Sequence, residues 1–367
     1  MPRSEEPDGA AVLTIDLDAV IANYRLLQGR LGRVPAAGVV KADAYGLGAA
    51  RVGPALAAAG CTIFFVAQLG EAIRLRQALA DQDIAVLEGF FPARQADFRE
   101  YRLIPVLNDL GQVESWRNAG GGSAILHVDT GMSRLGLTEG EVDRLAQDPE
   151  RLRGVALAYV MSHLASAEVS DDPQNAEQLA RFRRALARLP PAKASFANSS
   201  GIFLGAPYHF DLARPGAALY GIAPVEGTPN PMATTVRLEA PILQLREIGA
   251  GATVGYRAGF RASRPTRIAT IGVGYADGYL RSLANRGLGY IGGRPIPLVG
   301  RVSMDLITAD VTGVPEGEAH AGAMVELIGP NQPPDAVAEL AGTNGYEILT
   351  SLGPRYRRLY IGGAARA

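Results

Sequence analysis

Short apolar, β-branched runs alternate with longer amphipathic segments through roughly the first 235 residues of the chain. Eight of these runs have the length of a strand, and each is followed by a helix or by a segment long enough for one. The eight runs are 36–40, 62–66, 84–87, 103–106, 124–128, 155–160, 194–197 and 209–213. Eight strand–helix repeats predict an α/β fold of the (β/α)8 barrel type, with a doubly wound open sheet as the competing arrangement.

The amphipathic segments have the periodicity of surface helices. The segments 69–80 and 174–189 are the two clearest examples. In the second, Leu179, Phe182 and Leu186 recur at intervals of three or four residues, as does Leu189. Because such residues lie on one side of a helix, this side is expected to pack against the sheet.

The pattern changes after about residue 225, where helical periodicity fades and short strand-like runs separated by Gly and Pro take over. The runs 234–246, 266–273, 294–299 and 323–328 predict a second, mainly β domain. We therefore expect a disordered tail at 1–10, a barrel domain at 11–233 and a mainly β C-terminal domain at 234–367. The early run 12–18 precedes the first barrel helix and is a candidate to pair with the second domain.

Composition narrows the classes of partner. The chain has 367 residues, with 36 basic and 37 acidic side chains, so no overall field attracts nucleic acid or an anionic membrane. A single cysteine excludes an intrachain disulfide, and no apolar run is long enough to span a bilayer. The first ten residues carry acids and prolines where a signal peptide needs an apolar stretch. The expectation is a cytoplasmic protein.

Polar side chains gather at the carboxyl ends of the predicted barrel strands, where barrel enzymes place their reactive groups. Five of the eight strand ends contribute one or more of them. They are Lys41, Arg134, His163, Asn198, Ser199 and Arg214. Each alone is explained as a solvated strand end, but together they favour a site.

A lysine in a barrel mouth has a specific chemical use. Its amine forms a Schiff base with a carbonyl when burial or nearby cations lower its pKa. Pyridoxal phosphate is the common biological aldehyde for that role, and it needs a phosphate cradle. Ser199 and the backbone of the turn 214–217 are candidates for the cradle, although a tight turn alone also explains that segment. The four histidines lack the close spacing of metal ligands, which argues against metal catalysis.

The motifs then resemble those of one family. The segment VVKADAYGLGA (39–49) resembles the pyridoxal-phosphate attachment motif of alanine racemases. The resemblance continues in family order over most of the chain. It includes HVDTGMSRLG (127–136), SHLASAE (162–168), ANSSG (197–201), RPGAALYG (214–221), VGY (254–256), IGVGYADGYLR (271–281), GRVSMD (300–305) and YEILTSLGPRYRR (346–358).

The resemblance implies a two-base racemisation of alanine that supplies D-alanine for peptidoglycan. Lys41 would carry the cofactor and be one catalytic base, and Tyr256 from the second subunit of a head-to-tail homodimer would be the other. One base removes the α-proton and the other returns it on the opposite side of a plane. Both side chains have pKa values near ~10, so each needs a shift to work at neutral pH.

The resemblance also assigns supporting roles. Around the phosphate it places Tyr45, Ser199, Gly216, Ala217 and Tyr346. It places Arg214 opposite the pyridine nitrogen, with His163 and Asn198 among the groups around the cofactor. Arg134 and the backbone at Met304 would hold the substrate carboxylate. His163 and Arg281 would support the tyrosine base, and Tyr275 and Asp305 would line the entrance.

Three positions depart from the family pattern. His127 stands where many members have a carbamylated lysine that positions the arginine equivalent to Arg134. A neutral imidazole there either accepts one hydrogen bond from Arg134 or simply packs within its strand. Ser133 replaces a glycine, and Ser303 replaces a cysteine near the entrance.

Rival functions come from related classes. A decarboxylase of basic amino acids would pair the pyridine nitrogen with an acid rather than with Arg214. A non-catalytic pyridoxal-phosphate carrier would have a barrel alone, without a β domain. A racemase of serine, of lysine or of broad specificity is the nearest competitor.

Overall fold

The computed structural model describes residues 11–363, so the predicted tail at 1–10 and the last four residues lie outside it. The described chain forms two compact units. One contains residues 20–233, and the other combines 11–19 with 234–363. The N-terminal segment therefore belongs to the same unit as the C-terminal part of the chain.

The first unit is built on a parallel sheet whose seven strands lie side by side in chain order. They are β2 (Gly38–Val39), β3 (Ile63–Val66), β4 (Asp83–Val86), β5 (Leu103–Leu107), β6 (Gly122–His127), β7 (Val155–Met161) and β8 (Lys193–Ser195). Leu212 bridges Ser195 of β8, and Ala213 bridges Ala36 just before β2, so the sheet curls back on itself. This order confirms the TIM-like barrel over the doubly wound sheet, which would reverse its strand order.

The eighth strand is shorter than predicted. Residues 209–213 were expected to form a strand, but only Leu212 and Ala213 make ladder bridges. Phe210 has a left-handed φ of 50°, which breaks extended structure before the bridges begin.

Helices alternate with these strands, as the periodicity predicts. They are α1 (Leu17–Leu31), α3 (Ala49–Ala58), α4 (Leu69–Arg76), α5 (Gln95–Glu100), α6 (Leu110–Asn118), α7 (Glu139–Gln147) and α8 (Pro173–Leu186). The short segment α2 (Lys41–Tyr45) also follows β2, but its residues 42–45 have a left-handed backbone. The predicted helix 69–80 thus ends four residues early, and 174–189 ends three residues early. After β8 the connection contains only the 3₁₀ turns Ser200–Ile202 and Ala206–Tyr208, so the expected helix-sized segment is not an α-helix there.

Local sequence explains where α8 begins. Asp172 caps the helix by accepting the amide of Gln174 at 2.8 Å, and Pro173 occupies the first helical position. Leu179, Phe182 and Ala185 are buried along one face. The predicted inner face of the helix is therefore the one that packs.

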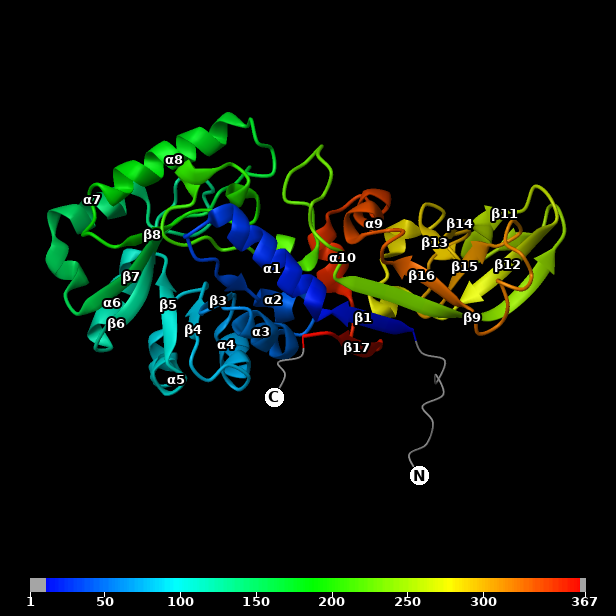
Figure 1. The fold of residues 1–367 in the computed structure, drawn as a ribbon, viewed down its shortest axis with the longest axis horizontal. Helices are drawn as coiled ribbons and strands as arrows, with labels where there is room; N and C mark the ends of the chain where they lie inside the picture. The colour runs from blue at the N-terminus through cyan, green and yellow to red at the C-terminus, as the bar shows by residue number, and fades with distance from the viewer. Residues whose placement is uncertain (1–10, 364–367) are drawn as a thin grey trace, which may run out of the picture. The chain divides into compact units, whose positions relative to one another are not determined.

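The second unit is mainly β, as predicted. Its strands are β1 (Val12–Asp16), β9 (Val236–Ile248), β10 (Thr253–Val254), β11 (Phe260–Arg261), β12 (Thr266–Ile271), β13 (Leu288–Ile291), β14 (Arg294–Pro297), β15 (Ile307–Asp310), β16 (Met324–Ile328) and β17 (Arg357–Ile361). The main sheet has the order β14-β13-β16-β9-β1-β17, and β12 pairs with both β9 and β15. In Figure 1 the blue strand β1 lies between β9 and the red β17.

Two helices in this unit are absent from the sequence prediction. They are α9 (Pro334–Ala341) and α10 (Gly345–Ser351). Asn344 caps α10 by accepting the amide of Glu347 at 3.0 Å. An Asn followed three residues later by Glu is a helix-start signal, so the pattern was present in the sequence. Across residues 11–363, no helix combines the length and the apolarity that crossing a bilayer requires.

Candidate functional site

Lys41 lies two residues beyond β2, at the carboxyl end of the barrel strands. The sequence contains only one other lysine, Lys193, which opens β8 and is exposed at the opposite end of the strands. Lys41 is partly buried. Burial and the charge of Arg134 lower the pKa of Lys41, and the Glu71 carboxylate partly opposes them. Both main effects favour the neutral, nucleophilic amine.

A small polar recess adjoins Lys41. Ser199 Oγ accepts the amides of Gly216 and Ala218 at 2.9 and 3.2 Å. With these two bonds its lone pairs are used, and its hydroxyl hydrogen has no acceptor within residues 11–363. A Cβ added to Gly216 would lie 2.5 Å from the hydroxyl of Tyr45, so only glycine leaves that hydroxyl in place. Ala217 follows directly and is buried. Hydroxyl donors around a glycine backbone fit a phosphate group.

Arg214 lies buried beside His163. Its guanidinium donates to Ser195 Oγ and to the Ser162 carbonyl, each at 2.5 Å, and Nη2 is 3.5 Å from His163 Nδ1. Burial lowers the pKa of Arg214 to about 10, so the group is still protonated at pH 7. Burial, with the charges of Arg214 and Lys41, lowers the pKa of His163 well below its ordinary value. The pair is therefore a cation beside a neutral imidazole.

Arg134 lies in the loop that follows β6. The Asp129 carboxylate folds this loop by accepting the amides of Gly131, Met132 and Ser133 at 2.9 to 3.1 Å. Ser133 has a left-handed φ of 55°, a backbone conformation that glycine adopts without steric cost. The Arg134 side chain itself is exposed.

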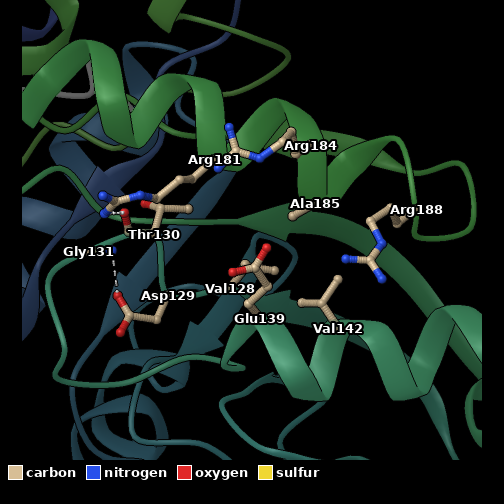
Figure 2. A pocket seen from close by; sticks show the side chains of 10 residues that line it. All are labelled: Val128, Asp129, Thr130, Gly131, Glu139, Val142, Arg181, Arg184, Ala185 and Arg188. Carbon is tan, nitrogen blue, oxygen red and sulfur yellow. Dashed lines mark hydrogen bonds between the residues drawn. The ribbon is translucent and has the colours of Figure 1, made fainter.

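Helix α8 anchors the same loop. Arg181 Nη1 donates to the Thr130 carbonyl at 3.0 Å, as Figure 2 shows. The buried Gln178 donates to Thr130 Oγ1 at 3.1 Å and to the His163 carbonyl at 2.9 Å. Gln178 therefore links the loop that carries Arg134 to the one that carries His163.

The pocket drawn in Figure 2 has a volume of about 420 Å³ and lies between this loop, α7 and α8. Arginines of α8 line it together with Asp129, Glu139 and Val142. None of the site residues predicted from the sequence lines it. The predicted site is therefore distinct from this pocket.

His127 ends β6 and is buried. Its Nδ1 lies 2.8 Å from Asn108 Oδ1, and the Asn108 amide nitrogen donates to the carbonyls of Leu87 and Val106 at 3.0 and 3.1 Å. Since Oδ1 only accepts, Nδ1 carries the hydrogen and Nε2 is left as an acceptor. Burial and the charge of Arg214 lower the pKa of His127 to about 4. His127 thus packs in its strand as a neutral imidazole with one nitrogen able to accept.

This burial predicts a pH dependence of folding stability. The unfolded state binds a proton at His127 below pH 6.5, whereas the folded state binds it only near pH 4. The contribution of neutral His127 to the free energy of unfolding is therefore fully present above pH 6.5, and about 3 kcal/mol of it is lost as the pH drops to 4. His127→Gln keeps a donor for Asn108 and is expected to flatten that part of the curve, as measured by urea unfolding from pH 7.5 to 4.5. The exposed His320→Gln is the control. Parallel curves for wild type and His127→Gln would contradict the prediction.

Tyr256 belongs to the second unit and lies on the connection between β10 and β11. The preceding Gly255 has a φ of 75°, and Arg257 and Ala258 also adopt left-handed φ values of 58° and 48°. This tight turn leaves the Tyr256 side chain 72% exposed. The tyrosine is thus held outward from its own unit.

Two further loops of the second unit are bonded to one another. Tyr275 and Ala276 donate their amides to the carbonyls of Ser303 and Met304 at 3.0 and 2.9 Å. A Cβ on Gly274 would lie 2.3 Å from the Met304 carbonyl, so glycine is required for this approach. The side chains of Tyr275 and Met304 are exposed. Arg281 opens a 3₁₀ turn and is exposed, and Tyr346 lies exposed in the first turn of α10.

Arg355 also joins these two loops, and the sequence analysis did not single it out. Its guanidinium contacts Asp305 at 2.8 Å and the buried Asp277 at 3.1 Å. Asp277 also accepts the amide of Gly274 at 2.8 Å. Asn108, Glu71 and Gln178 of the barrel were missed in the same way. Their partners are backbone groups or side chains brought close only by the fold.

The predicted site residues therefore fall into two groups. The barrel unit brings together Lys41, Tyr45, His163, Ser199, Arg214, Gly216 and Ala217 at the carboxyl ends of its strands, with Arg134 on an adjoining loop and Asn198 directly before Ser199. The second unit carries Tyr256, Tyr275, Arg281, Met304, Asp305 and Tyr346. Within residues 11–363 no three His, Cys, Asp or Glu side chains are grouped to hold a metal ion.

Comparison with known proteins covers both units. Residues 15–224 match the family described as "Alanine racemase, N-terminal domain", and residues 235–360 match "Alanine racemase, C-terminal domain". An alanine racemase of Rhodospirillum rubrum is 51% identical over 97% of this chain and 97% of its own length. A catabolic alanine racemase of Mesorhizobium japonicum is 50% identical over 99% of this chain and 96% of its own.

Solved structures give the same result. The structure of an alanine racemase from Bartonella henselae with covalently bound pyridoxal phosphate has a TM-score of 0.92 and 45% identity, and covers 96% of this chain and 99% of that one. A biosynthetic alanine racemase from Pseudomonas aeruginosa has a TM-score of 0.91 and 36% identity, with the same coverage.

Proposed function

Because the chain belongs to the alanine racemase family, whose members interconvert L-alanine and D-alanine with pyridoxal phosphate, we propose that Lys41 and Tyr256 are its two catalytic bases. The observation that carries the proposal is the position of Lys41. It is the one lysine at the carboxyl ends of the barrel strands, next to the recess formed by Tyr45, Ser199 and Gly216. Pyridoxal phosphate is the cofactor of this enzyme, and the recess has the donors that its phosphate requires.

When bound, pyridoxal phosphate supplies a conjugated system that accepts the charge left as the substrate α-proton departs. Lys41 would hold the cofactor covalently, and its amine would then remove or return the α-proton on one side. The lowered pKa of Lys41 supports this role, since only a neutral amine takes up a proton at neutral pH.

Arg214 would face the pyridine nitrogen of the cofactor. A guanidinium whose pKa is about 10 keeps its proton at pH 7 and acts only as a donor. It would therefore leave the pyridine nitrogen unprotonated and limit the charge that accumulates there. The neutral His163 beside it adds no second charge. His163 and Asn198 would complete the surroundings of the cofactor.

Arg134 would bind the substrate carboxylate as a charge-assisted donor, together with the backbone at Met304. His127 supports a positioning role toward Arg134, because its Nε2 is a neutral acceptor where many family members have a carbamate. A hydrogen bond from Arg134 to this nitrogen would be weaker than one to a carbamate, so the Asp129 and α8 contacts would hold most of the loop geometry.

We also propose that the enzyme acts as a homodimer in which Tyr256 serves the barrel site of the partner subunit. The 72% exposure of this side chain supports the proposal, since a base that works near neutral pH needs neighbouring donors or cations. Arg281 and the partner's His163 would supply them. Tyr275, Met304 and Tyr346 are also exposed on the second unit. Tyr275 and Asp305 would line the entrance, and Tyr346 would contribute to holding the phosphate.

The overall reaction is tested by proton NMR of the cofactor-loaded protein with L-alanine in deuterium oxide. The α-proton signal is expected to disappear with D-alanine accumulating, because two bases exchange the proton with solvent on both faces. L-Serine and L-lysine, run separately, are expected to react much more slowly. Exchange of the α-proton without D-alanine would contradict the two-base proposal.

Two aspects of the cellular role are also proposals. We place the enzyme in the cytoplasm, with which the free, buried thiol of Cys61 is compatible. We further propose that its D-alanine is used for peptidoglycan. Among the relatives, one is named catabolic and another biosynthetic, so the direction of flux belongs to the individual organism.

A further inference from the structure

The residues that follow Lys41 form a strained turn. Ala42, Asp43, Ala44 and Tyr45 all have left-handed φ values between 51° and 56°. None of them is glycine, and a left-handed conformation costs a residue with a Cβ about 1–2 kcal/mol. A run of four such residues persists only if the surrounding structure holds it.

Part of the restraint comes from within the turn. Ala44 donates its amide to the Val40 carbonyl at 2.9 Å, and Gly46 donates to Ala42 at 2.7 Å. Asp43 Oδ1 accepts the amide of Ala49 at 2.8 Å, which joins the turn to α3. These bonds fix the later part of the turn. The amide of Ala42, at the start of the turn, bonds to a residue outside it.

That partner is Glu71, which lies 29 residues further along the chain. Its Oε1 accepts the amide of Ala42, the peptide directly after Lys41, at 2.6 Å. Its Oε2 accepts the amides of Ala67 and Gln68 at 2.8 and 3.1 Å. One carboxylate thus ties the end of β2 to the end of β3 and to the first turn of α4.

We propose that Glu71 is a positioning residue for the reaction, which fixes the Ala42 peptide and thereby the Lys41 amine. The inference rests on the proposed function of Lys41. A carboxylate that accepts three backbone amides is held rigidly, and each bond is of the charge-assisted kind. A misplacement of about 1 Å at a reacting group costs about 100-fold in rate, so the rigidity of this peptide matters for catalysis.

The charges around Lys41 agree with this role. Burial and the charge of Arg134 lower the pKa of Lys41, whereas the Glu71 carboxylate raises it. The charge of Lys41 in turn lowers the pKa of His163. Glu71 is therefore close enough to balance part of the positive charge at the barrel mouth. It does so without an ion pair to Lys41, because its oxygens accept backbone amides.

The chain offers a matched control. Glu88 is partly buried, as Glu71 is, and accepts the amide of Leu69 at 3.0 Å, so it also caps α4. It makes no hydrogen bond to the Lys41 turn. Glu71→Gln and Glu88→Gln each replace one carboxylate at the same helix start. Glu71→Gln keeps one acceptor oxygen and gains an NH2 donor, so its side chain no longer accepts from both Ala42 and the amides before α4, whereas Glu88→Gln leaves the Ala42 bond in place.

The experiment compares the two variants as full-length holoenzymes. Glu71→Gln is expected to lower kcat about tenfold or more with KM changed by less than about twofold, because the reacting amine is displaced. It is also expected to release the cofactor to hydroxylamine faster than wild type. Glu88→Gln is expected to lose a similar amount of thermal stability while keeping kcat and cofactor release near wild type. Glu71→Asp, whose carboxylate is shorter by one methylene, should fall between wild type and Glu71→Gln.

Equal kcat and equal cofactor release in Glu71→Gln and Glu88→Gln would mean that Glu71 only caps α4, and would overturn the proposal. Borohydride reduction of wild type followed by peptide mass analysis reports separately on the proposed function. Attachment of the cofactor to Lys193 would overturn the role of Lys41 and that of Glu71 together. If the cofactor is attached to Lys41 but Glu71→Gln and Glu88→Gln have equal kcat and equal cofactor release, only the proposed role of Glu71 is overturned.

Discussion

Lys41→Ala is expected to lower the alanine racemisation rate by at least about 10³-fold, since it removes both the covalent attachment and one base. The variant should also lose its cofactor during gel filtration, because only the donors around the phosphate would still hold it. Racemisation is measured by polarimetry from either enantiomer, and cofactor content by visible absorbance.

The two-lysine sequence gives this experiment an internal control. Lys193→Ala changes the only other lysine, which is exposed at the far end of β8, and should keep wild-type activity and cofactor content. A supplied small amine is expected to restore part of the activity of Lys41→Ala, because it replaces the missing base in the space the side chain leaves. Lys41→Ala that retains covalently bound cofactor would contradict the assignment.

Tyr256→Phe is expected to lower the rate by about 10²–10⁴-fold through loss of the second base, while cofactor binding stays intact. The variant removes one oxygen from a side chain that is 72% exposed, so the fold should be unaffected. The α-proton of one alanine enantiomer should still exchange with solvent deuterium through Lys41, whereas racemisation is slowed by that factor. NMR in deuterium oxide separates these two outcomes.

The shared site predicts complementation between inactive chains. When Lys41→Ala and Tyr256→Phe are mixed through reversible unfolding, half of the dimers combine the two chains, and one of their two sites has both bases. Racemisation should then recover to about a quarter of the wild-type rate, since every closed two-fold dimer contains two equivalent sites. A mixture as inactive as its parents would show that Tyr256 does not act across subunits.

Much of the barrel followed from the sequence because its signals are local. The apolar runs at 62–66 and 103–106 are strands with nearly every residue buried, as parallel strands covered on both faces require. The strand ends then predict which loops carry Lys41, Arg134, His163 and Arg214. Those positions depend only on where each strand stops.

The missed features depend on contacts between distant residues. The turn at 42–45 has no glycine and so carries no signal of its left-handed backbone, which is held in part by Glu71. Helix α4 ends at Arg76 rather than at residue 80, because the Arg76 guanidinium donates to the carbonyls of Leu79 and Gln82 and folds the chain back. The tautomer of His127 likewise follows from its contact with Asn108, and nothing in the sequence around His127 indicates that contact.

The parallel pairing of β1 with β17 determines the order in which the chain is able to fold. Val12 is in register with Arg357, and β17 covers the outer edge of the inner strand β1, so the second unit lacks this edge strand until residues 357–361 are made. Residues 20–233 emerge from the ribosome as a complete set of barrel elements much earlier. Addition of β17 is consequently a late folding step of high contact order, and until it occurs the free edge of β1 is open to pairing with other chains.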